Sequence, residues 1–467
     1  MHSDRKNESR LPGLGRWFGL GAIIGLTVLL LAGGGRWLDV AAAEGAPPAG
    51  PEPAQAGELF GGPRIAVIAD TSSGMSAQLA ALSTVWDDTD IAHLSEALYS
   101  GYWVTDTVVQ GPTTPDPAVM QSWLASLQAQ DGGACPDAVL QALMATAQAA
   151  PGRPDGVSAL LLTDSSPQGG RRAIARTLNR LVEQNVELHL LLSGWCDDPQ
   201  GPPPSLARLL ALMTGGNAFP VAVGDEISAT AMALNLMAAQ EDLLLAAGTV
   251  TPGEADDFSF PVAPGLDTLV LQVTEAGPDP EPWPPCLTCP LRLEPGVIWD
   301  PYTATFRLPG GTTIGPDDPG VRFFVGLDSV QMVVGSPDGP ALPAGDWQLR
   351  IEGNLSYTLR LAAHAAIRMA YVGPHSVPAG RSFPVRVALE LPPGAGIEND
   401  TVQSIIVPRS SVSVVAGPEL YDDGLHGDGA AGDGIFGGKL TLPPGAYYLG
   451  IRGRLEGGGM VQRFEAA

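Results

Sequence analysis

Positive charge is scarce in this chain of 467 residues. Lysine occurs only at Lys6 and Lys439, and 25 Lys and Arg residues stand against 50 Asp and Glu residues, which gives a net charge of −25. A surface of this sign repels phosphate backbones. The sequence therefore argues against nucleic acid as a partner.

Recognisable catalytic machinery is also missing. No G-x-S-x-G nucleophile elbow occurs, and the six histidines are scattered along the chain. His189 lies inside the predicted strand "VELHLLL", where a packed side chain is more common than a general base. We predict that the chain is not an enzyme.

Cysteine is rare, with four residues in all. Cys286 and Cys289 form a C-x-x-C pair in "PWPPCLTCPLRL". A structural zinc site needs four ligands, and no second cysteine pair or histidine cluster lies nearby in the sequence. A redox role needs a thioredoxin-like βαβ context, which the Pro-rich surroundings do not provide. We predict a small local disulfide here.

The N-terminus has the pattern of an export signal. Four basic residues precede a continuously apolar run from Trp17 to Gly35, and Ala41 and Ala43 offer an A-x-A cleavage site. Residues 1–43 are therefore a signal peptide or, since the run approaches spanning length, an uncleaved membrane anchor. Both alternatives place the rest of the chain in a secreted or cell-surface location, with membrane contact only through this segment.

The remaining sequence predicts a multidomain fold class. A Pro/Gly/Ala-rich linker covers 44–62. From 63 to 243, buried strand patterns alternate with amphipathic helix patterns, which is typical of an α/β Rossmann-like domain with a parallel sheet. The period then changes to the alternation of antiparallel strands, and we expect two all-β sandwich domains, over 244–368 and 369–467.

Ligands of an open α/β sheet bind beyond the carboxyl ends of its strands. The loops expected at that edge are "DTSSGM" from Asp70, "DGGACPD" from Asp131, "TDSSPQGG" from Thr163 and "SGWCDDPQG" from Ser193. Their order resembles a von Willebrand factor A (vWA) domain, and "GGACPD" with "WCDD" resembles the hemicentin-like type. The resemblance implies a metal-ion-dependent adhesion site, in which a divalent cation accepts a carboxylate from a protein partner.

The resemblance places Asp70 and Ser72 at the first two ligand positions and Asp164 at the position of the third loop. Two hydroxyl ligands are missing, because Gly74 and Ala134 stand at their positions. Hard cations take about six oxygen ligands, some of them from water. The site is therefore degenerate: it either still holds Mg²⁺ or Ca²⁺, with added waters or with Asp137, or is a vestigial hydrogen-bonded cluster.

The same resemblance implies a disulfide between Cys135 and Cys196, since the family carries cysteines in these two loops and export makes oxidation available. Both loops are expected at the carboxyl edge of the sheet. The alternative is a pair of buried thiols.

The β part of the chain has its own resemblances. Residues 254–273 and 344–363 resemble the β-sandwich that follows the hemicentin-like A domain, and also the pre-peptidase C-terminal modules of secreted proteases. The last unit resembles bacterial immunoglobulin-like modules in "YDDGLHGDGAAGDG", where Asp423, Asp428 and Asp433 each precede glycine at intervals of five residues. Such a loop either binds Ca²⁺ or caps its own turns with the Asp side chains.

Together these patterns predict an extracellular or cell-surface adhesion protein that binds a protein or a cell-surface ligand. Mg²⁺ or Ca²⁺ is the only cofactor that the sequence suggests. The alternative function is a non-catalytic accessory component of a secreted hydrolase system.

Overall fold

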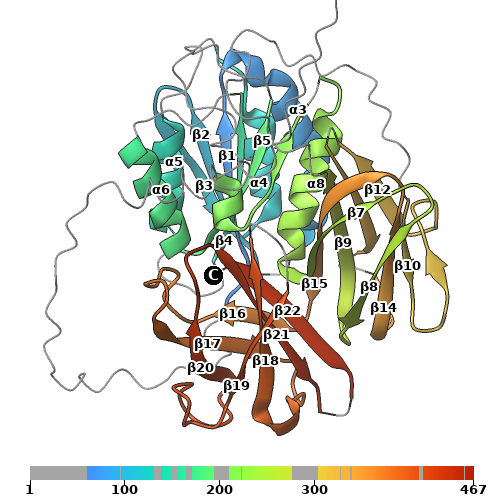
Figure 1. Ribbon diagram of the computed structural model, residues 1–467. Helices are drawn as coiled ribbons and strands as arrows, with labels where there is room; N and C mark the ends of the chain where they lie inside the picture. Colours follow the sequence, from blue (N-terminus) through green and yellow to red (C-terminus); the bar gives the residue numbers. More distant parts are fainter. Residues whose placement is uncertain are drawn as a thin grey trace, which may run out of the picture. The chain divides into compact units, whose positions relative to one another are not determined.

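The computed structural model describes residues 60–94, 96–130, 138–149, 156–164, 171–193, 210–221, 223–275, 303–326, 328–336, 339–409, 414–456 and 458–466 (Figure 1). These residues all belong to one compact unit, Pro53–Ala467. The predicted signal or anchor and all four cysteines lie outside the described residues. Within the described ranges, no helix combines the length and apolar character needed to cross a membrane.

A six-stranded sheet forms the first part of this unit, in the order β3-β2-β1-β4-β5-β6. All neighbours pair in parallel except β3, which is antiparallel to β2. The chain moves outward from β1 in one direction and then in the other, so the strand order switches beside β1, as in doubly wound sheets. The strands are β1 (Arg64–Asp70), β2 (Leu98–Val104), β3 (Val108–Thr114), β4 (Val157–Thr163), β5 (Val186–Leu192) and β6 (Ala218–Pro220).

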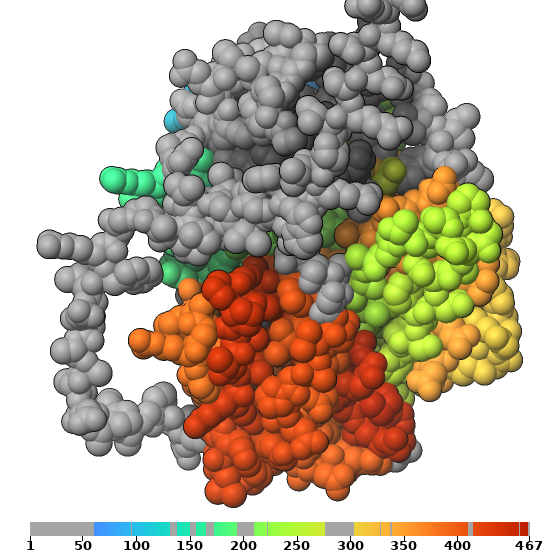
Figure 2. Space-filling model, in the orientation of Figure 1, coloured from blue at the N-terminus to red at the C-terminus, as the bar shows by residue number. Residues whose placement is uncertain are grey.

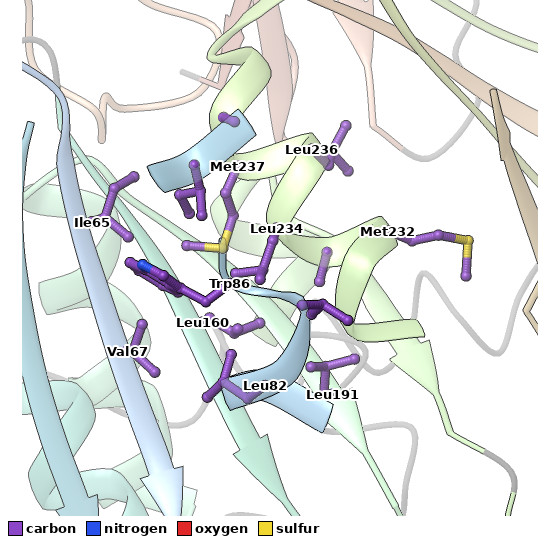
Figure 3. Packing of buried hydrophobic residues seen from close by; sticks show 14 of the residues in the cluster. Ile65, Val67, Leu82, Trp86, Leu160, Leu191, Met232, Leu234, Leu236 and Met237 are labelled. Carbon is purple, nitrogen blue, oxygen red and sulfur yellow. The ribbon is translucent and has the colours of Figure 1, made fainter. Parts of the chain in front are cut away.

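Helices cover both faces of this sheet, and this explains why β1, β4 and β5 are apolar runs rather than alternating patterns. On one face α5 and α6 pack on a core that includes Leu143 and Leu161, and on the other α3, α4 and α8 enclose Trp86 and Leu160. Figure 3 shows Trp86, Leu160 and Met237 in this second core. The helices are α3 (Ser76–Val85), α4 (Pro117–Ser126), α5 (Val139–Ala149), α6 (Arg171–Glu183) and α8 (Glu226–Ala239).

Two antiparallel sheets form the first β unit. One has the order β11-β10-β14-β8, and the other contains β12, β13, β9, β15 and β7. Their facing side chains share one core, in which Phe306 packs edge to face against Phe260 and Trp347, with ring centroids 6.1 and 5.9 Å apart. The strands are β7 (Glu241–Val250), β8 (Ala255–Val262), β9 (Leu266–Glu275), β10 (Thr303–Arg307), β11 (Thr313–Ile314), β12 (Val321–Val325), β13 (Ser329–Gly335), β14 (Gly345–Glu352) and β15 (Leu355–Ala365).

A second antiparallel unit follows and surrounds its own core, which includes Val387, Leu420 and Ile451. Its last strand, β22, pairs with β7 through Phe464 and Asp242, so that twelve strands of the two β units are hydrogen-bonded in one series. In Figure 2 the orange and red residues of the second unit adjoin the green residues of the first. The strands are β16 (Arg368–Tyr371), β17 (Ser382–Glu390), β18 (Thr401–Pro408), β19 (Val415–Tyr421), β20 (Ile435–Thr441), β21 (Tyr447–Arg454) and β22 (Met460–Ala466).

The predicted fold class is confirmed at the level of an α/β sheet followed by antiparallel β units. The domain boundaries stay predictions, and β7 begins at Glu241, just before the boundary predicted between 243 and 244.

A buried ionic cluster joins the first β unit to the amino end of the α/β sheet. Arg360 of β15 donates from Nε to Asp242 Oδ1 and from Nη2 to Glu187 Oε1, each at 2.6 Å, and from Nη1 to the Gly215 carbonyl at 3.2 Å. Arg360 is 8% exposed. Arg360 and His189 lower the pKa of Glu187 to about 2 in spite of its burial, so Glu187 is ionised and the cluster is a true ion pair.

Candidate metal site

The carboxylate of Asp70 is held firmly at the carboxyl end of β1. Asp70 is fully buried. Its Oδ1 accepts a hydrogen bond from the Ser72 backbone N at 2.8 Å, and its Oδ2 accepts one from Thr163 Oγ1 at 2.9 Å. Each oxygen keeps a further lone pair, so this side chain can still contribute to a cation.

Asp164 comes from the neighbouring strand end, directly after β4. Ser72 Oγ donates to Asp164 Oδ2 at 3.1 Å. Asp164 Oδ1 is buried and has no hydrogen-bond partner in the described part of the chain. Burial, together with the negative charge of Asp70, raises the pKa of Asp164 to about 6. Two neighbouring carboxylates that are partly shielded from water need either a shared proton or a cation to offset their repulsion.

The residues present therefore fit a hard divalent cation, with two carboxylates and the Ser72 hydroxyl as protein ligands and water in the remaining positions. Across the described ranges, no group of three or more His, Cys, Asp or Glu side chains is placed to hold a metal ion. A cation at Asp70 and Asp164 would accordingly depend on water for about half of its coordination.

Gly74 has a direct role in this geometry. A Cβ at this position would lie 2.5 Å from Asp164 Oδ2, which is closer than van der Waals contact allows. The serine that the vWA resemblance expects here would therefore move the Asp164 carboxylate. Glycine in place of serine at position 74 removes a hydroxyl ligand, but it leaves the space that the Asp164 carboxylate occupies.

We expect Gly74→Ala to weaken binding of Mg²⁺ or Ca²⁺ about tenfold or more, because the added methyl group displaces the Asp164 carboxylate. Stability should change little, since a terminal carboxylate can rotate away. Calorimetric titration of the cation measures the affinity, and Ser73→Ala at the adjacent exposed position is the control. Equal affinities for Gly74→Ala and the wild type would show that Asp164 is not a ligand.

Ser72 contacts both Asp70 and Asp164, while the predicted role of these three residues as metal ligands stays a prediction. Thr163 was missed as a member of the cluster, although a threonine directly before the acidic residue was a signal for it. Ala134, Asp137, and the predicted disulfides Cys135–Cys196 and Cys286–Cys289 lie outside the described residues. His189 is buried in β5, and its Nδ1 accepts a hydrogen bond from the Asn217 backbone N at 3.3 Å, so it is a packed residue.

The Asp-rich loop of the second β unit caps its own turns. Asp428 accepts hydrogen bonds from the backbone N of Gly424 and His426, and Asp433 from those of Ala430 and Ile435. Asp423 similarly accepts from the Leu425 backbone N at 2.9 Å. These contacts are the ones that the turn-capping alternative requires, while calcium binding at this loop stays a prediction.

Asp422 lies at the centre of this loop, and no sequence pattern pointed to it. It is 5% exposed and accepts hydrogen bonds from the backbone N of Gly432, Asp433 and Gly434 at 2.8, 3.2 and 2.9 Å. The five-residue spacing of Asp-Gly pairs includes its neighbour Asp423 but not Asp422.

Comparisons with known proteins give little further information. No family model matches the chain, and no curated protein matches it. Among solved structures, an aerotolerance-related membrane protein from Bacteroides fragilis is 13% identical over 38% of this chain and 98% of its own, with a TM-score of 0.29. BatB from Bacteroides thetaiotaomicron is 16% identical over 36% and 99%, with a TM-score of 0.27.

The ArnB paralog VWA2 from Sulfolobus acidocaldarius is 10% identical over 77% of this chain and 65% of its own, with a TM-score of 0.28. Likenesses as slight as these carry no argument about fold or function.

Proposed function

We propose that this chain is an exported binding protein whose α/β domain is of the vWA kind and captures a protein or cell-surface ligand through a divalent cation at Asp70, Ser72 and Asp164. The observation that carries the proposal is the pair of carboxylates at the carboxyl edge, beside the switch in strand order, with Asp70 fully buried and Asp164 half-buried. Ligands of open α/β sheets bind at this place.

The chain's own residues would do three things at this site. Asp70 is fixed by hydrogen bonds to both of its oxygens. Ser72 links the loop after β1 to Asp164, and Asp164 offers an unpaired buried oxygen. A bound divalent cation would supply open coordination positions for an oxygen of the ligand. No proton transfer or bond cleavage is part of this role.

Cation affinity should depend on pH. Since the pKa of Asp164 is raised to about 6, a proton competes with the cation below that pH. We expect affinity for Mg²⁺ or Ca²⁺ to be about tenfold lower at pH 5 than at pH 7 and to level off above pH 7. Calorimetric titration of the purified full chain measures it.

Asp164→Asn is the matched variant for this titration, because it keeps the shape of the side chain and removes the titrating group. It should abolish both the heat of binding and its pH dependence. Retention of both in Asp164→Asn would contradict the metal site, and it would leave the vestigial cluster as the correct alternative.

Ligand binding and location test the rest of the proposal. Binding to a cell surface should be lost in EDTA and restored by millimolar Mg²⁺. Substrate turnover by the purified chain that one substitution abolishes would refute a binding role, and recovery of the full-length chain from the cytoplasm would refute export.

A further inference from the structure

A cavity opens beside the candidate metal site. It measures about 230 Å³, and two tryptophans, Trp103 of β2 and Trp123 of α4, line it. Thr71, which lies between Asp70 and Ser72, lines it as well, and so does Gln130, whose backbone N donates to the Thr71 carbonyl at 2.7 Å. The cavity and the metal site therefore share the loop after β1.

Two glycines determine how Trp123 is seated. A Cβ on Gly101 of β2 would lie 2.7 Å from the Trp123 ring, and a Cβ on Gly111 of β3 would lie 2.8 Å from it. The indole thus lies directly against the backbone of two strands. Trp103 lies beside it, with ring centroids 6.4 Å apart and planes at 33°. Both indoles remain partly exposed.

The other lining groups are neutral and polar. The exposed residues Gln128, Gln130 and Ser126 line the cavity, and none of its described lining residues is charged. Ser126 donates its proton to the Trp123 carbonyl at 2.7 Å, so its oxygen can only accept from a ligand. A carboxamide both donates and accepts. In a chain with a net charge of −25, this neutrality favours an uncharged ligand.

We infer that this cavity binds a neutral pyranose residue of a glycan. A sugar ring presents an apolar C–H face that can lie on an indole, and its hydroxyls both donate and accept, as the carboxamides do. A proline ring could use the indoles but would leave the carboxamides to water. The inference names a ligand class for the proposed binding function and rests on that function, yet it does not require the cation.

The test begins with neutral oligosaccharides as probes. The purified full chain is applied to an array carrying tetraoses of glucose, mannose, galactose and N-acetylglucosamine, together with proline-rich peptides. The best-bound probe is then titrated by calorimetry, with and without EDTA. We expect a neutral oligosaccharide to bind in both conditions.

Two variants remove the stacking surface in different ways. Trp103→Ala deletes one indole, and Gly101→Ala keeps both indoles but pushes Trp123 out of place. Each should weaken oligosaccharide binding about tenfold or more. Gly310→Ala is the matched control, since a Cβ there meets nothing within 4 Å, and it should bind as the wild type does. Equal thermal midpoints show that the variants are folded.

The outcomes separate this inference from the proposed function. Oligosaccharide binding that survives Asp164→Asn but not Trp103→Ala supports the cavity whatever the cation does. Cation binding without any neutral oligosaccharide bound at millimolar concentration overturns the cavity and leaves the metal site standing. Binding of proline-rich peptides alone, or oligosaccharide binding that is unaffected by both variants, also overturns it.

Discussion

Replacing Arg360 with methionine is expected to lower the free energy of unfolding by about 3–5 kcal/mol. Methionine keeps much of the aliphatic volume but removes the guanidinium that pairs with Asp242 and Glu187 at 2.6 Å. Asp242 and Glu187 would then lose the guanidinium that neutralises them, and Glu187 would keep, among the described residues, only its contact with His189. The cost of a poorly compensated buried charge dominates. Urea denaturation at pH 7.5 measures the loss.

Arg350→Met is the control, on strand β14 in the other sheet of the same β unit. Arg350 also holds two carboxylates, Asp257 at 3.0 Å and Glu352 at 2.6 Å, but its side chain is 48% exposed. Water and salt screen such surface pairs, so no measurable loss is expected. If the two variants were equally stable, burial would not be what makes the Arg360 cluster matter.

The second large effect is a fall in stability as pH rises. Burial raises the pKa of Glu241 to about 7, even though Arg463 and Arg368 oppose the shift. The folded state therefore holds this proton more tightly than the unfolded state does. The stabilisation is complete below about pH 4.5, is lost as pH rises towards 7, and amounts to up to about 3 kcal/mol.

Glu241→Gln should remove most of this dependence between pH 6 and pH 8, because the amide does not titrate. Asp164 and Asp242, whose pKa values burial raises to about 6, leave a smaller slope of the same sign. Glu187, with its pKa near 2, acts outside this window. Urea denaturation at pH 5, 6, 7 and 8 measures the slope, with exposed Glu352→Gln as the control. A slope in Glu241→Gln as steep as in the wild type would assign the effect to other groups.

Sequence patterns predict the helices and strands in which apolar residues follow one clear pattern. The strands at 64–70 and 157–163 are uniformly apolar because helices cover both faces of the sheet, and α6 has a sharply amphipathic pattern. The helix α8 has no polar stripe that would predict it, because it is buried on almost every side, between the sheet and the first β unit. Strands β2 and β3 lack a clear apolar pattern, because glycine, serine and glutamine interrupt it.

The candidate site was predictable to the extent that it follows from the topology. Strand ends of a parallel sheet meet at one edge, and this rule alone brings Asp70 and Asp164 together. The Arg360 cluster was not predictable in this way, because 173 residues separate Arg360 from Glu187 and only the docking of a β unit on the sheet brings them into contact. The position of Trp123 was not predictable either, because it depends on contact with two glycines in β2 and β3, whose sequences have no clear strand pattern.

The pairing of β7 with β22 joins two strands that are synthesised at very different times. Gln462 Nε2 donates to the Leu243 carbonyl at 2.7 Å across 219 residues of sequence. While the chain is being synthesised, β7 emerges long before its second neighbour exists, and this side of the strand stays open until the last strand arrives. Open strand edges recruit other chains. The interval between these two strands is therefore the period in which a nascent copy of this protein is most exposed to aggregation.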